Sequence, residues 1–189
     1  MTPELLHPLN ILNQKWEEIS MEFIEGLPVS DGNDNIFVIV DRLTKYAHFI
    51  AMRKSDSTKQ IFEIFCKKNY KLHGFPKVIM SNRDAKFKGN FWKESFKHIG
   101  TNLNMSSSYH PQTDGQTEVV NKCLEVYLRC YATNKQNKWV QWLHLVEWWK
   151  NSTYHTLAKM TPFQALYGYE YPKWKDFAIV QMELPAVKN

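Results

Sequence analysis

Three polar residues, far apart in the chain, are of types that can hold divalent cations: Glu22, Asn82 and Glu118. Glu22 lies inside one apolar segment and Asn82 directly follows another, while 35 residues separate Asn82 from Glu118. Hard cations such as Mg²⁺ prefer carboxylate and amide oxygens, and two such ions about 3.5 to 4 Å apart can hold the attacking and leaving oxygens of a phosphoryl displacement. The three residues therefore indicate a metal-dependent phosphoryl transfer site.

Each acidic residue also has a simpler interpretation as a solvated surface carboxylate. Glu22 is flanked by Met21 and Phe23 in a segment that we expect to be central in a sheet. A buried carboxylate without a partner is costly, so Glu22 favours a ligand or hydrogen-bonding role. Glu118 is stabilised by the positive end of the helix that it opens, whether or not a metal binds.

Strands and helices that could position these residues follow from the hydrophobic periodicity. Residues 16–27, 36–40 and 46–52 are predicted to form three strands joined by short turns, which is an antiparallel meander. Within residues 61–72, apolar side chains then recur at helical spacing, which predicts a helix that ends at Gly74 and Pro76. A strand at 77–80, a helix at 91–99 and a strand at 102–105 follow, and this alternation predicts parallel pairing.

The second half of the chain is predicted to be helical after one loop. Residues 106–116 are rich in Ser, Pro and Gly, as expected of a loop. A long amphipathic helix follows Thr117 and includes Leu124, and a second one spans 139–150. Thr161 is expected to cap a last short helix. Four tryptophans near the second helix favour core or interface packing over base stacking: Trp139, Trp142, Trp148 and Trp149.

Five stretches, taken in order, resemble the integrase core of gypsy-type LTR retrotransposons and, more distantly, of retroviruses. They are ISMEFIEGLP, VDRLTKYAHFI, LHGFPKVIMSNRD, YHPQTDGQTEVVNKCLE and TPFQALYG, and the resemblance covers roughly residues 5–172. It implies an α/β, ribonuclease H-like fold with a five-stranded mixed sheet flanked by helices. We expect a lead segment at 1–15, a catalytic-core-like domain at 16–172 and a C-terminal tail at 173–189.

The resemblance also implies a catalytic and metal-binding triad in which Glu22 and Asn82 stand where the family has Asp, and Glu118 where it has Glu. Glu22 is one methylene longer than Asp, and such sites tolerate displacements of only about 0.5 Å. Asn82 removes one negative charge, and hard cations prefer charged oxygens. We expect weakened binding of Mg²⁺ or Mn²⁺ and little or no strand transfer. Asp84 could replace the lost carboxylate, although the family has an Asp there without a ligand role.

DNA is the partner implied by the resemblance, as element ends and as target DNA. Tyr109, His110 and Gln112 lie in the segment that resembles the family's active-site loop, and Lys122 follows Glu118 by one helical turn. The net charge of +5 suits a polyanion but is weak support alone. Four further lysines are more often a solvated face: Lys86, Lys88, Lys93 and Lys97.

Composition sets broad limits on the alternatives. A chain of 189 residues with 43% hydrophobic and 23% charged residues is expected to fold as one domain. Its three cysteines form no disulfide framework, and no run approaches the roughly 20 apolar residues of a membrane span. The family implies a homodimer or higher oligomer and a nuclear location. A non-catalytic nucleic-acid-binding or dimerisation module and an active ribonuclease H remain alternative functions.

Overall fold

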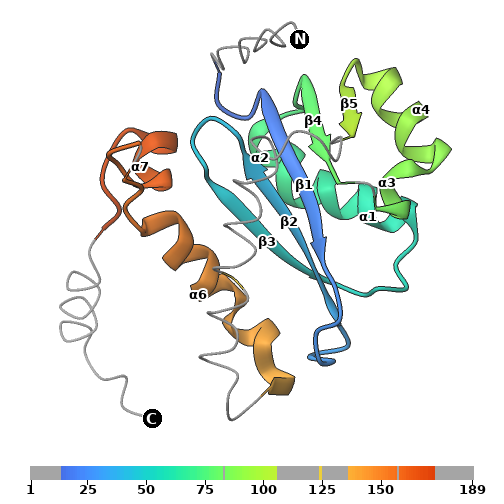
Figure 1. Cartoon of the computed structure of the whole chain (residues 1–189), viewed down its shortest axis with the longest axis horizontal. Coiled ribbons are helices and arrows are strands. Elements are labelled where there is room, and N and C mark those ends of the chain that lie inside the picture. Colours follow the sequence, from blue (N-terminus) through green and yellow to red (C-terminus); the bar gives the residue numbers. More distant parts are fainter. Residues whose placement is uncertain (1–13, 83, 106–123, 125–135, 157, 173–189) are drawn as a thin grey trace, which may run out of the picture.

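A five-stranded mixed sheet organises the chain in the computed structural model, which describes residues 14–82, 84–105, 124, 136–156 and 158–172 (Figure 1). Its strands lie in the order β3-β2-β1-β4-β5. The β1–β2 and β2–β3 pairs are antiparallel, while β1–β4 and β4–β5 are parallel. The predicted meander and the predicted parallel half are both confirmed. The strands are β1 (Glu18–Ile24), β2 (Asn35–Asp41), β3 (Ala47–Met52), β4 (Val78–Ser81) and β5 (Asn102–Met105).

Helices cover both faces of this sheet because β2 and β3 alternate between two apolar clusters, one on each face. On one face, side chains such as Met21 and Ile39 pack with Phe65 of α1 and Trp92 of α4. On the other face, side chains such as Val38 pack with α6, which Figure 1 shows running beside β3. The helical elements are α1 (Thr58–Phe65), η1 (Cys66–Tyr70), α2 (Lys71–His73), α3 (Ala85–Lys88), α4 (Asn90–Ile99), η2 (Gln136–Lys138), α6 (Trp139–Ser152) and α7 (Pro162–Tyr167).

Local capping explains most helix boundaries. Ser57 and Gln60 form a reciprocal capping box at the start of α1, and Thr161 accepts a hydrogen bond from the Gln164 N–H at the start of α7, as predicted. Gly74 ends the helical segment that begins at Thr58, also as predicted, and adopts a φ of +81°. Two features were not predicted: the π-helical turn η1 inside that segment, and the four-residue helix α3.

The first strand is shorter than the predicted range of 16–27. Trp16 lies before β1 with a φ of +61°, and its backbone N–H donates to the Asp41 side chain at 3.0 Å. Asp41 is buried and also accepts hydrogen bonds from the backbone N–H and hydroxyl of Thr44. The Asp41 carboxylate therefore holds Trp16 in a non-strand conformation, although the two residues are 25 positions apart in the sequence.

Helix α6 is attached to the edge strand β3 by side chains that take the place of a neighbouring strand. The buried Asn151 amide accepts from the Ala47 N–H at 2.8 Å and donates to the Ala47 carbonyl at 2.9 Å. Glu147 accepts from the Phe49 N–H at 2.8 Å. Trp139, at the start of α6, is buried in the same apolar cluster, whereas Trp142 is exposed. In the described part of the chain, no helix is long and apolar enough to cross a membrane.

Candidate functional site

Glu22 and Asn82 occupy neighbouring positions where the parallel pairing of two adjacent strands ends. The parallel pairing of β1 and β4 runs from Glu18 with Val78 to Met21 with Ser81. Glu22 and Asn82 are the next residues on the two segments, and adjacent strands lie about 4.8 Å apart. The structure therefore brings together two of the three residues that the sequence singles out.

Glu22 is an acidic residue within the central strand of the sheet. β1 is the central strand of the sheet, and Glu22 is partly buried opposite Val38 of β2. Its strand neighbour Ile24 belongs to the apolar cluster that α6 and Leu124 cover. Leu124 is helical and 1% exposed, so a residue from the second half of the chain packs on this face.

The side chain of Asn82 makes a local turn with the residues that follow it. Its Oδ1 accepts a hydrogen bond from the Asp84 N–H at 3.2 Å. Asp84 in turn caps α3, because its Oδ1 accepts from the Lys86 N–H at 2.8 Å. The amide oxygen of Asn82 can still offer a second lone pair to a cation. The carboxylate of Asp84 is engaged at the helix start, which weighs against a ligand role for it.

The remaining predicted site residues lie outside the described part of the chain. These are Glu118, the proposed third ligand, and the proposed DNA contacts Tyr109, His110, Gln112 and Lys122. Among the described residues, no group of three His, Cys, Asp or Glu side chains could hold a metal ion. The described donors are thus one carboxylate and one amide, both hard oxygen ligands of the kind that Mg²⁺ and Mn²⁺ accept.

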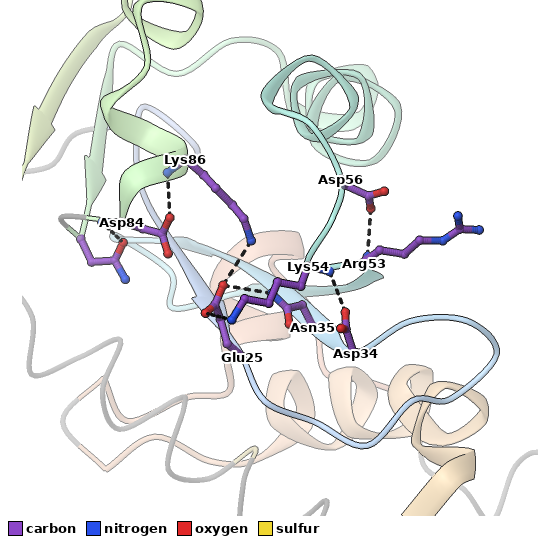
Figure 2. Close-up of polar contacts among 9 residues, drawn as sticks. Glu25, Asp34, Asn35, Arg53, Lys54, Asp56, Asp84 and Lys86 are labelled. Carbon is purple, nitrogen blue, oxygen red and sulfur yellow. Dashed lines mark hydrogen bonds and ion pairs between the residues drawn. The ribbon is translucent and has the colours of Figure 1, made fainter.

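Glu25 is the centre of an ion-pair network that the sequence did not indicate. Its Oε1 accepts from the Lys86 ammonium at 3.2 Å and from the Asn35 amide at 3.2 Å, and its Oε2 lies 3.4 Å from the Lys54 ammonium. Figure 2 shows both lysines converging on Glu25. The hydrogen bond from Lys86 is the main cause that lowers the pKa of Glu25. Burial of the carboxyl group raises this pKa, and the positive charges of Lys86 and Lys54 lower it further.

Lys86 differs from the three lysines that were grouped with it in the sequence. Its side chain is only 17% exposed, and its ammonium lies 4.6 Å from the centroid of the Phe23 ring. Phe23 is the residue after Glu22, and its ring stacks on the rings of both Phe37 and Phe87. Lys88, Lys93 and Lys97 are exposed, as expected of a solvated face.

A second polar cluster joins β3, α2 and α6, away from Glu22 and Asn82. The Nδ1 of His48 lies 3.0 Å from Glu147 Oε1, and its Nε2 lies 3.0 Å from the Nε2 of His73. Trp16 stacks on the His73 ring with centroids 3.8 Å apart. Burial, and secondarily His48, lower the pKa of His73 to about 4. His48 and Glu147 also line a cavity of about 680 Å³.

The chain is similar over almost all of its length to part of two transposon polyproteins. The Transposon Tf2-3 and Tf2-4 polyproteins of Schizosaccharomyces pombe are 34% identical to it over 184 residues, which is 97% of this chain. The chain spans 13% of the length of these relatives. No family model matches the chain.

Two solved structures share the fold. The simian T-cell lymphotropic virus intasome in complex with PP2A regulatory subunit B56 gamma matches with a TM-score of 0.69 and 13% identity, over 91% of this chain and 63% of that one. The HTLV-2 integrase catalytic core domain in complex with magnesium, in its trimeric form, matches with a TM-score of 0.62 and 14% identity, over 79% and 95%. The predicted ribonuclease H-like fold is thereby confirmed.

Proposed function

Since this chain is an integrase core-like domain of the retrotransposon polyprotein family, we propose that it descends from a DNA strand-transfer enzyme. We propose that it still binds DNA but that its metal site is impaired. The observation that carries this proposal is the adjacent placement of Glu22 and Asn82 at the ends of β1 and β4. A carboxylate and an amide from separate strands meet there, at the carboxyl edge of a sheet of the integrase-core type.

The metal would be held by Glu22, Asn82 and Glu118. Mg²⁺ or Mn²⁺, when bound, would supply stabilisation of the attacking and leaving oxygens at the DNA phosphate. The HTLV-2 core was solved with magnesium, and the oxygen donors of Glu22 and Asn82 suit the same class of ion. The role of the two described side chains is to fix the position of such an ion at the sheet edge.

Impairment follows from the chemistry of the two described ligands. Asn82 offers a neutral oxygen where an acid would offer a charged, bridging one, and that oxygen already accepts the Asp84 N–H. Glu22 carries one more methylene than the family's Asp, so its oxygens reach a different point from the strand. Both changes weaken the ion's binding, and we propose that 3′-end processing and strand transfer are reduced or lost.

DNA binding and assembly belong to the same proposal. Tyr109, His110, Gln112 and Lys122 would contact the DNA of element ends and target, and the net charge of +5 favours this polyanion. The simian virus protein was solved in an intasome, and the HTLV-2 core in dimeric and trimeric forms. We accordingly propose that residues 16–172 act as one unit in a homodimer or higher oligomer, in the nucleus.

A second candidate function is a DNA-binding or dimerisation module without catalysis. The hydrogen bond from the Asp84 N–H to Asn82 favours it, since it gives Asn82 a purely local role in shaping the turn before α3. This module would bind DNA equally well with and without divalent cations.

Strand transfer into plasmid DNA from labelled terminal-repeat oligonucleotides separates the two candidates. We expect the unmodified chain to be nearly silent and the Glu22→Asp, Asn82→Asp double variant to gain Mn²⁺-dependent joining. A folded double variant that binds DNA but remains silent would favour the module. Vigorous joining by the unmodified chain would overturn the proposed impairment, and cleavage of RNA in RNA–DNA hybrids would instead indicate a ribonuclease H.

A further inference from the structure

We infer that Glu25 and Lys86 are positioning residues that set the separation between the ends of β1 and β4, and thereby the affinity of the Glu22–Asn82 site for a divalent cation. This inference rests on the proposed function, because it assigns a supporting contact to the proposed metal site. Neither residue is offered as a ligand.

The two residues connect the segments that immediately follow the two proposed ligands. Glu25 comes three residues after Glu22, just beyond β1, and Lys86 comes four residues after Asn82, in α3. The 3.2 Å contact between Lys86 Nζ and Glu25 Oε1 therefore joins the two segments a short distance downstream of the site.

The described pairing of β4 with β1 stops one residue before Asn82. The parallel ladder ends at Met21 with Ser81, so Asn82 lies just past its last paired residues. Beyond that point α3 has only four residues, and a single helical turn has little stability of its own. The turn that carries Asn82 consequently depends on side-chain contacts for its position.

The Lys86 side chain is well suited to provide such a contact. It is 17% exposed, and its ammonium lies over the Phe23 ring at 4.6 Å. Phe87, the next residue, stacks on the same ring with centroids 4.7 Å apart. A partly buried, laterally confined ammonium loses less side-chain entropy on pairing than a freely exposed one and is less screened by solvent.

Lys54 provides a matched control within the same network. Its ammonium lies 3.4 Å from the other carboxylate oxygen of Glu25, but its side chain is 65% exposed and it belongs to the segment between β3 and α1. Removing Lys54 takes one positive charge from the same carboxylate and leaves the connection to α3 intact. Comparing the Lys54 and Lys86 substitutions therefore separates the effect of losing a charge near Glu25 from the effect of losing the connection to α3.

The test is the affinity for Mn²⁺ of the 189-residue chain carrying Asn82→Asp, measured by titration calorimetry, with further substitutions made in that background. We expect Lys86→Met and Glu25→Gln to weaken the affinity about tenfold, as is usual for contacts that orient metal ligands. Lys54→Met should stay within about twofold, and Lys86→Arg should restore most of the affinity because Arg can also pair and stack. Unchanged affinity in Lys86→Met, or equal losses in Lys86→Met and Lys54→Met, would overturn the inference.

Amide hydrogen exchange at residues 84–88 provides a second measurement that needs no metal. Lys86→Met should accelerate exchange there by about tenfold relative to Lys54→Met, because the turn loses its anchor to β1. If the Asn82→Asp parent binds no Mn²⁺, the proposed metal site fails by itself. The exchange rates then decide whether Glu25 and Lys86 position residues 84–88. Equal rates in Lys86→Met and Lys54→Met would refute that role.

Discussion

Glu22 and Asn82 are the first residues beyond the last parallel pair of β1 and β4, and thus lie side by side at one edge of the sheet. Two carboxylates at this spacing would repel each other unless a cation lay between them. A carboxylate beside an amide has no such conflict. The present pair is therefore compatible with a folded, metal-free chain, and restoring the acid should make folding depend on the cation.

We expect Asn82→Asp to be stabilised by Mn²⁺ more than the unmodified chain is. A cation that binds only the folded state raises the free energy of unfolding by about 2.7 kcal/mol at one hundred times its Kd. Thermal unfolding with and without MnCl₂ measures the difference. Asn104→Asp adds the same charge at an exposed position of the neighbouring strand β5 and serves as control. Equal Mn²⁺ effects in both variants would show general charge screening instead of a site.

Asp84 is expected to act as a helix cap and not as a replacement ligand. Asp84→Asn keeps an acceptor for the Lys86 N–H, so it should leave stability nearly unchanged, while Asp84→Ala should cost about 1 kcal/mol. In the Asn82→Asp background, Asp84→Asn should change Mn²⁺ affinity by less than about threefold. Chemical denaturation and calorimetry provide the two measurements. A loss of Mn²⁺ binding in Asp84→Asn would instead assign the carboxylate to the metal.

Stability is expected to fall as the pH drops from about 6.5 to about 4. Burial and His48 lower the pKa of His73 to about 4, so in this window the unfolded chain binds a proton that the folded chain does not. Because His73 is partly exposed and solvent screens it, we expect an effect of about 1 to 2 kcal/mol. Urea denaturation at several pH values measures this slope.

The matched variants for this slope are His73→Gln and His98→Gln. His73→Gln should flatten the dependence, because it removes the ring whose pKa is lowered in the folded chain. His98 is exposed on α4, and its replacement should leave the slope as it is. A slope that is equally steep in His73→Gln and the unmodified chain would contradict the assignment.

The strands could be predicted because their periodicity is local. The run at 36–40 lies within β2, buried along its whole length, and 102–105 coincides with β5. The helix α3 could not be predicted, since four residues are too few to display a helical period. Its cap Asp84 and its side-chain partner Glu25 are recognisable only in three dimensions.

Residues of the candidate site could be predicted from the sequence only where the family resemblance, or a polar residue in an apolar run, indicated them. Glu22 and Asn82 carried that signal, and their adjacency depends on the register of β1 with β4, which no local pattern specifies. Glu25 and Lys86 are 61 residues apart and resemble ordinary surface charges. A signal that could have raised Lys86 above its neighbours is its place directly before the apolar Phe87, on a segment close to Asn82.

Asn151→Ala is expected to lower the free energy of unfolding by about 2 to 4 kcal/mol. The substitution leaves the N–H and carbonyl of buried Ala47 without partners, and each unsatisfied buried group costs about 1 to 3 kcal/mol. Gln141→Ala, at an exposed position of the same helix, controls for helix propensity and should change stability by less than about 0.5 kcal/mol. Urea denaturation compares the two. If both variants unfold at the same urea concentration, the Asn151 amide does not hold α6 on β3, and the contact of Glu147 with Phe49 and the apolar contacts of α6 must do so.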